Sequence, residues 1–416
     1  MSFTLLQLVA TIYAFVQFAF ADEVGTVLFP NTSFFEIEHY YPSPRYHVYP
    51  RRTDFSVASF VNWGQITDYN SKANDGDDYF SLETGPFAYC AIGNYSFWLS
   101  QYGRGSLAGA GAHFLMAMNG SHPSWAKIHP DLDDIDEDYN TMIPYTDDEN
   151  DAMNEPYYFT FFAPRSSCVM TSATTAVQVW EILHEKRDDL AIGSMLVNYT
   201  INPDEGTFAS TRPQDVYSSY YVDDDDDADY QYGYGLLSTM KVNGVIYMYA
   251  VDRSSYGNYQ DVLLASAPAS TVLDKSTWSY WQNSTQSWNT TEPLATKRRQ
   301  DDAVYTASSS IGYQIDGGSM GSIFYSEYHH AYIFTYSTSD DPSTLIIEYA
   351  PTPAGPWSQN EQVLVNSTDV DFNYAIVTPY FYNSPAHEGH VGKELLISVS
   401  PASYDNTYWA YKLSFE

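Results

Sequence analysis

The feature that most constrains the fold of this chain is a recurring pair of short apolar runs joined by a polar turn. Three such pairs are Val245–Val251 with Val262–Ala265, Ala331–Tyr336 with Leu345–Tyr349, and Leu395–Val399 with Tyr408–Tyr411. Apolar runs separated by turn residues are typical of β-hairpins. The 39 Tyr and 22 Phe also favour strands, because aromatic side chains suit a half-buried pleated surface. Sustained helical periodicity is absent after the amino terminus, and the best candidate, Val177–Lys186, is short and β-rich at its start.

The hairpin unit recurs at intervals of roughly 60 to 90 residues, with connections of variable length between the copies. Small sheets repeated in this way favour a β-propeller, in which each blade is one sheet packed on its neighbours. We therefore expect an all-β, five-bladed β-propeller that forms a single domain over residues 22–416. Two β-sandwich domains or a β-helix are the alternatives, and a sandwich pair would need a linker. The basic Lys297–Arg299 is the only candidate cleavage point, either a surface loop or a processing site.

Residues 1–21 predict a secretory signal peptide. The segment carries no charged side chain, ends in the small-x-small pattern of Ala19 to Ala21, and is followed at once by Asp22. An uncleaved membrane anchor is the alternative, but polar residues interrupt the apolar run and a cleavage pattern ends it. Later segments are too polar to span a bilayer. We therefore expect a secreted, extracellular chain that has no membrane partner.

Two further features agree with an extracellular location. Asn-x-Ser/Thr acceptors lie at Asn31, Asn94, Asn119, Asn198, Asn283, Asn289 and Asn366. Acceptors spread along a chain with a signal peptide indicate an N-glycosylated protein, whose glycans need solvated loops or strand edges. Cys90 and Cys168 are the only cysteines, and in an oxidising compartment we expect them to form one disulfide bond. Neither has a Cys or His at ligand spacing, which argues against zinc.

The charge of the chain excludes some partners. The 52 acidic and 18 basic residues give a formal net charge of -34, which would repel nucleic acid and anionic membranes. The acidic runs Asp131–Asp138, Asp147–Asp151 and Asp223–Asp227 are interpreted as solvated loops. The run from Asp134 does not form an EF-hand, because Tyr139 stands where the turn glycine belongs. We therefore expect no cofactor, while calcium in these loops stays an open alternative.

Two short motifs resemble hydrolase signatures without their structural context. Gly317–Gly321 spells G-x-S-x-G, but the strand-like sequence that follows it lacks the helix that a nucleophile elbow requires. A secreted serine esterase is therefore only a third hypothesis. His387-Glu388-Gly389-His390 is one residue shorter than the H-E-x-x-H zinc motif, and the neighbouring Pro and Gly residues favour a loop.

Carboxylates are better candidates for chemistry. Hydrolysis of a glycosidic bond needs one protonated acid and one ionised carboxylate on either side of the sugar. Asp54 precedes the apolar run Val57–Val61, Asp68 ends the run Trp63–Asp68, and Glu327 comes just before another predicted strand. If these runs are inner strands of a propeller, the three carboxylates face its central channel. Exposed carboxylates at strand ends are the alternative interpretation.

Aromatic residues also suit a carbohydrate surface, because flat apolar rings stack on the C–H faces of sugars. Most of the nine Trp residues must nevertheless pack inside the protein. Trp278, Trp281 and Trp288 lie in a polar stretch that also carries glycosylation acceptors, so we expect partial exposure there.

The second half of the chain has a familiar order of segments. These are Asn243–Tyr249, Asp261–Ala267, Trp278–Trp281 with Trp288, Gly318–Ser322, Ile346–Ala350 and Gly355–Ser358. From about residue 233 to residue 416 this order resembles a domain-of-unknown-function family of secreted, five-bladed β-propellers of the glycosidase type, which includes microbial endo-D-arabinanases. Most of the matching residues are expected to build blades.

The first half resembles the same family over shorter stretches. The family opens with an Arg-Asp-Gly-Gly-like segment and continues with a strand that ends in Asp-Thr. Arg52–Phe55 and Thr67–Asp68 are similar, although the glycines are missing and the second pair is reversed. The resemblance implies that Asp54 and Asp68 are catalytic carboxylates. Glu327, which the strand pattern singles out, is a third candidate. The leading hypothesis is a secreted, monomeric glycoside hydrolase that acts on a cell-wall or extracellular polysaccharide. The alternative is a non-catalytic propeller that binds glycan or a surface partner, which the missing glycines favour.

Overall fold

The computed structural model describes residues 55–66, 87–92, 95–100, 115–118, 126–128, 143, 158–164, 166–172, 174–186, 189–202, 207–212, 218–222, 233–251, 261–293, 303–306, 321–338, 341–358, 363–367, 370–379, 392–401 and 408–416. Within these ranges the only helix is a single 3-10 turn at Lys275–Thr277, and all other elements are strands. The all-β prediction is confirmed. In the described part of the chain, no helix is long and apolar enough to cross a membrane.

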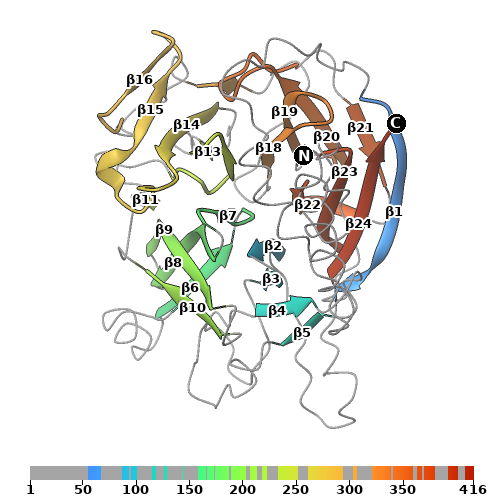
Figure 1. The fold of residues 1–416 in the computed structure, drawn as a ribbon, viewed down its shortest axis with the longest axis horizontal. Coiled ribbons are helices and arrows are strands. Elements are labelled where there is room, and N and C mark those ends of the chain that lie inside the picture. Colours follow the sequence, from blue (N-terminus) through green and yellow to red (C-terminus); the bar gives the residue numbers. More distant parts are fainter. Residues whose placement is uncertain are drawn as a thin grey trace, which may run out of the picture.

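The described strands form five antiparallel sheets around a common centre (Figure 1). The first sheet contains β2 (Phe87–Ile92), β3 (Tyr95–Ser100), β4 (Leu115–Met118) and β5 (Ala126–Ile128). The second contains β6 (Tyr158–Pro164), β7 (Val169–Met170), β8 (Thr175–Lys186), β9 (Asp189–Asn202), β10 (Thr207–Thr211) and β11 (Ser218–Val222). The segment with weak helical periodicity in the sequence is strand β8.

The third sheet contains β12 (Ser238–Val242), β13 (Val245–Val251), β14 (Asp261–Pro268), β15 (Ser279–Gln282), β16 (Ser287–Asn289) and β17 (Tyr305–Thr306). The fourth contains β18 (Ser322–Ser326), β19 (Ala331–Thr338), β20 (Asp341–Ala350) and β21 (Val363–Asn366). The fifth contains β22 (Val370–Thr378), β23 (Glu394–Pro401), β24 (Tyr408–Phe415) and β1 (Val57–Ile66).

The inner strands of the five sheets contact one another in a closed ring. Strand β2 contacts β7, β7 contacts β12, β12 contacts β18, β18 contacts β22, and β22 contacts β2 again. Figure 1 shows β2, β7, β18 and β22 near the centre, with the later strands of each sheet further out. This ring of sheets is the β-propeller arrangement that the repeated hairpins predict.

Hydroxyl groups join neighbouring inner strands of the ring. Ser238 Oγ accepts a hydrogen bond from the Ile323 N–H at 2.7 Å, which ties β12 to β18. Ser322 Oγ accepts one from the Val377 N–H at 2.9 Å, which ties β18 to β22. Because Ser238 and Ile323 lie at the starts of their strands, β12 and β18 run side by side in the same direction.

The amino-terminal strand completes the last sheet. Strand β1 pairs with β24, so it lies on the outer edge of the sheet whose inner strand is β22 (Figure 1). The expectation that Val57–Val61 and the run from Trp63 are inner strands is therefore wrong. The two runs form one strand, with a pairing irregularity between Asn62 and Gly64. Pairing of the first strand with the last one closes the ring.

The two ends of the ring are built differently. Each inner strand turns into its neighbour at what we call the hairpin end, where Asn243–Gly244 and Glu327–His330 form tight turns. Adjacent strands are antiparallel, so in the four-stranded sheets the chain leaves the outermost strand at the opposite end. We call this the crossing end, because there the chain crosses from one sheet to the inner strand of the next.

The core lies between neighbouring sheets, and strand β13 shows how it forms. Side chains alternate along a strand, so Ile246 and Met248 pack towards Val177 and Val179 of the second sheet. Tyr249, on the opposite face of β13, packs with Phe334 and other residues of the fourth sheet. Both faces of this sheet are therefore apolar, as a blade between two neighbours requires.

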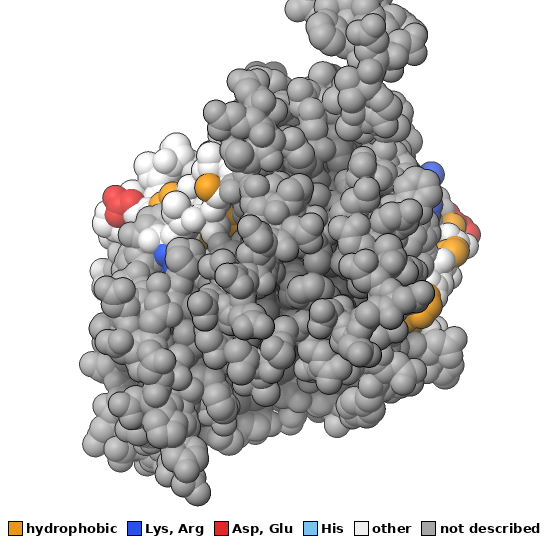
Figure 2. Space-filling view, turned by 90° about the horizontal axis from the view of Figure 1, so that it is seen from below, with side chains coloured by type: hydrophobic (Ala, Val, Ile, Leu, Met, Phe, Trp, Pro, Cys, Tyr) orange, Lys and Arg blue, Asp and Glu red, His pale blue; other side chains and the backbone are white. Residues whose placement is uncertain are grey.

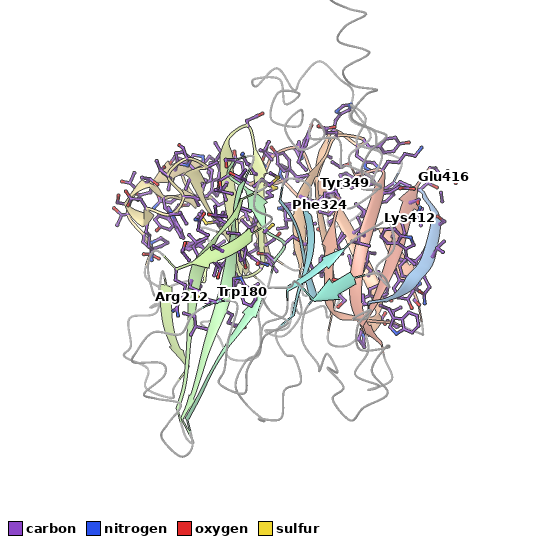
Figure 3. The ribbon with its side chains drawn as sticks, turned by 60° about the horizontal axis from the view of Figure 1, so that its bottom comes forward. Trp180, Arg212, Phe324, Tyr349, Lys412 and Glu416 are labelled. Carbon is purple, nitrogen blue, oxygen red and sulfur yellow. The ribbon has the colours of Figure 1, made fainter. Side chains whose placement is uncertain are left out.

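Buried polar side chains in the second sheet bond to one another. The Trp180 Nε1–H group donates to Tyr199 Oη at 2.7 Å, and the Tyr199 hydroxyl donates to Gln178 Oε1 at 2.7 Å. Burial raises the pKa of Tyr199 well above its ordinary value, so the phenol stays protonated and keeps its donor. Figure 3 shows Trp180 within the sheet of β8 and β9.

Candidate functional site

Glu327 is the one predicted site residue that falls inside the described ranges. It lies in the turn between β18 and β19 at the hairpin end, and its side chain is 8% exposed. The Glu327 carbonyl accepts a hydrogen bond from the His330 N–H at 3.3 Å. Ser326 Oγ bonds to His329 Nδ1 at 2.9 Å and accepts a bond from the His329 N–H at 3.2 Å. The turn that carries Glu327 is therefore held by its own neighbours.

The segment that leads into β1 packs against this turn. The Phe55 ring stacks on the His329 ring at a centroid distance of 4.3 Å, and on the Tyr349 ring at 4.3 Å. Phe415 meets His329 edge-on at 4.6 Å. Figure 3 shows Tyr349 among the strands of the fourth sheet and Glu416 at the rim beside β1. Asp54, which precedes Phe55 in the chain, lies outside the described residues.

Asp68 follows the other end of β1 and also lies outside the described residues. A ten-residue strand spans about 30 Å. The start of β1 therefore lies beside the Glu327 turn at the hairpin end, whereas Ile66 lies at the crossing end. Phe55, which follows Asp54 in the chain, therefore lies beside the Glu327 turn, whereas β1 ends at Ile66, at the opposite end of the ring. The joint role of Asp54 and Asp68 stays a prediction.

Buried carboxylates that sequence reasoning missed are Glu181, Asp261 and Glu348. Glu348 is fully buried, and its Oε1 accepts a hydrogen bond from the Tyr336 hydroxyl at 2.9 Å. It lies in β20 within the apolar run Leu345–Tyr349, among residues that pack against the third sheet. A lone carboxylate in an apolar strand was the signal available in the sequence. Its surroundings indicate a structural role, because a sugar could not reach it.

Asp341 is an accessible carboxylate at the crossing end. It begins β20 and accepts hydrogen bonds from Thr344 Oγ1 at 2.6 Å and from Ser343 Oγ at 2.7 Å. These hydroxyl donors, Thr344 first, hold the pKa of Asp341 below its ordinary value. Asp341 is therefore ionised at neutral pH, and it could stabilise positive charge but could not donate a proton.

The three clustered tryptophans have different environments. Trp278 is 1% exposed and donates its Nε1–H to the Val272 carbonyl at 2.8 Å, so it belongs to the core. Trp281 is partly buried, and its ring lies 5.2 Å from the ring of Trp288. Trp288 is 40% exposed, and Val61 is the other large apolar side chain among the described residues that is exposed. Figure 2 shows exposed apolar atoms at two rims, on the sides where Figure 1 has β16 and β1.

Other motifs have structural roles or lie outside the described residues. Trp357, in the Gly-Pro-Trp-Ser segment, packs edge-on against Phe334 at 5.7 Å. Ser358 N–H donates to the Tyr349 carbonyl at 2.9 Å, which fixes the segment to β20. The H-E-G-H segment, most of the G-x-S-x-G segment and the three acidic runs lie outside the described ranges. Within those ranges, no group of three or more His, Cys, Asp or Glu residues could hold a metal ion.

The closed ring of sheets defines the chain as a β-propeller. No protein-family model matches the sequence, and no curated protein sequence matches it. Several solved structures are similar. One is a protein of Bacteroides ovatus ATCC 8483, described provisionally as a hydrolase, with 16% identity and a TM-score of 0.49 over 81% of this chain and 86% of that one.

Two other similar structures are glycan-degrading enzymes. A family 117 glycoside hydrolase of the marine bacterium Zobellia galactanivorans has 10% identity and a TM-score of 0.46 over 86% of this chain and 91% of that one. An exo-β-1,3-galactanase of Phanerochaete chrysosporium has 9% identity and a TM-score of 0.42 over 85% of this chain and 63% of that one.

Proposed function

We propose that this chain is a secreted glycoside hydrolase on a five-bladed propeller, one blade for each of the five sheets, and that it acts on a cell-wall or extracellular polysaccharide. The observation that carries the proposal is the difference between the two ends of the ring. At the hairpin end, short turns join β12 to β13 and β18 to β19. Long connections belong to the crossing end, and a rigid scaffold with long loops is where catalytic residues concentrate.

The same connections carry the acidic runs of the sequence. Asp131–Asp138 and Asp147–Asp151 come between β5 and β6, and Asp223–Asp227 comes between β11 and β12. Each is a connection from an outer strand to the next inner strand. Glycosidic cleavage needs an acid and a base that are both carboxyl groups. The chain thus supplies carboxylates to the connections of the crossing end, where we place the substrate.

Among the three predicted site residues, Asp68 is the one that these considerations favour. It belongs to the connection between β1 and β2, which crosses from the outer edge of the fifth sheet to an inner strand. Asp54 and Glu327 are associated with the hairpin end, where Glu327 has little exposed surface. We propose Asp68 as a catalytic carboxylate and place its partner among the acidic connections.

The experiment is a screen of the secreted protein on diverse polysaccharides, with detection of new reducing ends. We expect Asp68→Asn to lower the rate at least about 100-fold, because an amide can neither donate nor accept the required proton. Glu327→Gln is the matched variant and should retain most of the activity. An Asp68→Asn protein that cleaves as fast as the parent would contradict the site. Binding of a polysaccharide without any cleavage would favour the non-catalytic alternative.

Secretion, N-glycosylation and the disulfide are part of the same proposal. Strand β2 carries Cys90, and β7 begins immediately after Cys168. The two strands are in contact within the inner ring. This proximity supports a bond between Cys90 and Cys168, which would link the first two sheets.

A further inference from the structure

The hairpin of β15 and β16 brings an aromatic pair and a glycosylation acceptor together. Trp281 and Trp288 are directly opposite each other in the pairing of the two strands. Asn283–Gln286 forms the connecting turn, in which the Gln286 N–H donates to the Asn283 carbonyl at 3.3 Å. Gln286 has a φ of 51°, the left-handed conformation that closes such turns. Asn283 is thus fixed two residues after Trp281.

The side chain of Asn283 is held in a defined orientation beside the indole. Its Oδ1 accepts a hydrogen bond from Gln286 Nε2 at 2.7 Å and a longer one from Trp281 Nε1 at 3.5 Å. Both bonds use the oxygen of the amide. The nitrogen, Nδ2, is the atom that carries a sugar in N-glycosylation. The acceptor sequence is completed by Thr285, which is exposed.

The surface next to this acceptor is chemically suited to a neutral sugar. Trp288 is 40% exposed, and the ring of Tyr247 lies 6.3 Å from it. The segment from Ser279 to Thr291 contains no charged side chain, but it is rich in amides and hydroxyls. Aromatic faces stack on the C–H groups of a pyranose ring, and the polar groups can bond its hydroxyl and acetamido groups.

We propose that Asn283 carries an N-linked glycan whose first N-acetylglucosamine packs on Trp281 and Trp288. The proposal rests on the secreted location. The sugar donor for this transfer is an oligosaccharide linked to a lipid diphosphate. Nδ2 of Asn283 forms a bond to the anomeric carbon of the first sugar, and the bond from that carbon to the diphosphate oxygen breaks. The lipid diphosphate leaves with the electron pair of the broken bond, and the amide nitrogen loses one proton. The exposed tryptophan surface is then covered by the protein's own glycan, and it is not a docking surface for a separate polysaccharide.

Asn289 is a natural comparison within the same hairpin. Its Oδ1 accepts a hydrogen bond from the Thr291 N–H at 3.0 Å, so its amide is turned towards the chain that follows β16. Thr291→Ala removes this second acceptor sequence without changing Asn289. Asn283→Gln and Thr285→Ala remove the first acceptor sequence in two independent ways.

The experiment uses full-length protein secreted from a eukaryotic host. Peptide mapping measures the occupancy of Asn283, and oxidation by N-bromosuccinimide followed by mass spectrometry measures the accessibility of Trp288. We expect Asn283 to be occupied. We also expect Trp288 to oxidise several-fold faster in Asn283→Gln and Thr285→Ala than in the parent or in Thr291→Ala.

Enzymatic trimming identifies the sugar that makes the contact. Endoglycosidase H leaves one N-acetylglucosamine on the asparagine, so the protection of Trp288 should survive this treatment. An unoccupied Asn283 would overturn the proposal. Equal oxidation of Trp288 in the parent and in Asn283→Gln would also overturn it. The same holds if Trp288 loses its protection in Thr291→Ala but keeps it in Asn283→Gln. Loss of protection after trimming would also refute it, since an outer sugar would then make the contact.

Discussion

Replacement of Phe55 by alanine tests the closure of the ring, because this residue fixes the segment that enters β1. Phe55 is 4% exposed and stacks on His329 and Tyr349, each at a centroid distance of 4.3 Å. It also meets Phe415 edge-on at 6.2 Å. These three neighbours come from the fourth and fifth sheets. Phe55 thus links the amino-terminal strand to the blade next to its own.

The expected cost of Phe55→Ala to the free energy of unfolding is about 4 kcal/mol. A buried Phe→Ala change costs about 3–5 kcal/mol through lost apolar burial and the cavity that remains. Aromatic pairs contribute about 0.5–1.5 kcal/mol each beyond burial, and Phe55 makes two stacked pairs. Phe55→Leu should cost less than Phe55→Ala, about 2 kcal/mol, because it keeps most of the apolar volume and loses only the stacking.

The assay is equilibrium unfolding in urea, followed by the midpoint and slope of the transition. Phe60→Ala is the matched control. Phe60 is partly exposed on β1 and stacks on Tyr411 at 4.9 Å, so its loss should cost about half as much. The reasoning would be refuted if Phe55→Ala cost less than about 1 kcal/mol, or less than Phe60→Ala.

Two other predictions concern single positions. Gly392 has a φ of +88°, and a Cβ there would lie 2.3 Å from Ser326 Oγ and 2.9 Å from Ser326 Cα. Gly392→Ala should therefore cost more than about 2 kcal/mol in urea unfolding. Gly244→Ala, at φ +72° with open space around it, should cost about 1 kcal/mol, and equal costs would show that the contact with Ser326 is unimportant. Mass spectrometry of the secreted protein should find a mature chain that begins at Asp22 and a Cys90–Cys168 disulfide; an intact Met1 or two free thiols would contradict the assigned compartment.

The strands were predictable because their signals are local. The predicted run Val245–Val251 is strand β13 itself, and the Asn243–Gly244 turn before it has φ values of 53° and 72°. Asn and Gly are the residues that tolerate such values, so this hairpin can be recognised from a few neighbouring residues. Ala331–Tyr336 and Leu395–Val399 likewise fall within β19 and β23, in two other sheets.

The partner of β1 could not be predicted in the same way. Val57 pairs with Phe415, more than 350 positions away, and no local pattern specifies a partner at that separation. The apolar runs on either side of Asn62 look like two strands because a bulge interrupts the alternation there. The placement of Asp54 and Asp68 on inner strands depended on that interpretation. Glu348 was missed for a related reason, since its partner Tyr336 becomes visible only when β19 and β20 are paired.

The acidic runs are concentrated in connections of the crossing end, and this charge disfavours acidic polysaccharides as substrates there. These runs account for much of the net charge of -34. A polysaccharide of uronic acids or sulfated sugars would meet a strongly negative potential there, and its approach would be slowed. A neutral glycan carries no charge to be repelled, so the rate of its cleavage should depend little on ionic strength. Salt screens charges separated by more than about 8–10 Å, so it would weaken the repulsion of an acidic glycan. Cleavage of an acidic glycan, if it occurred, should rise steeply with salt. A preference for an acidic polysaccharide at low ionic strength would place the substrate at the other end of the propeller, beside Glu327.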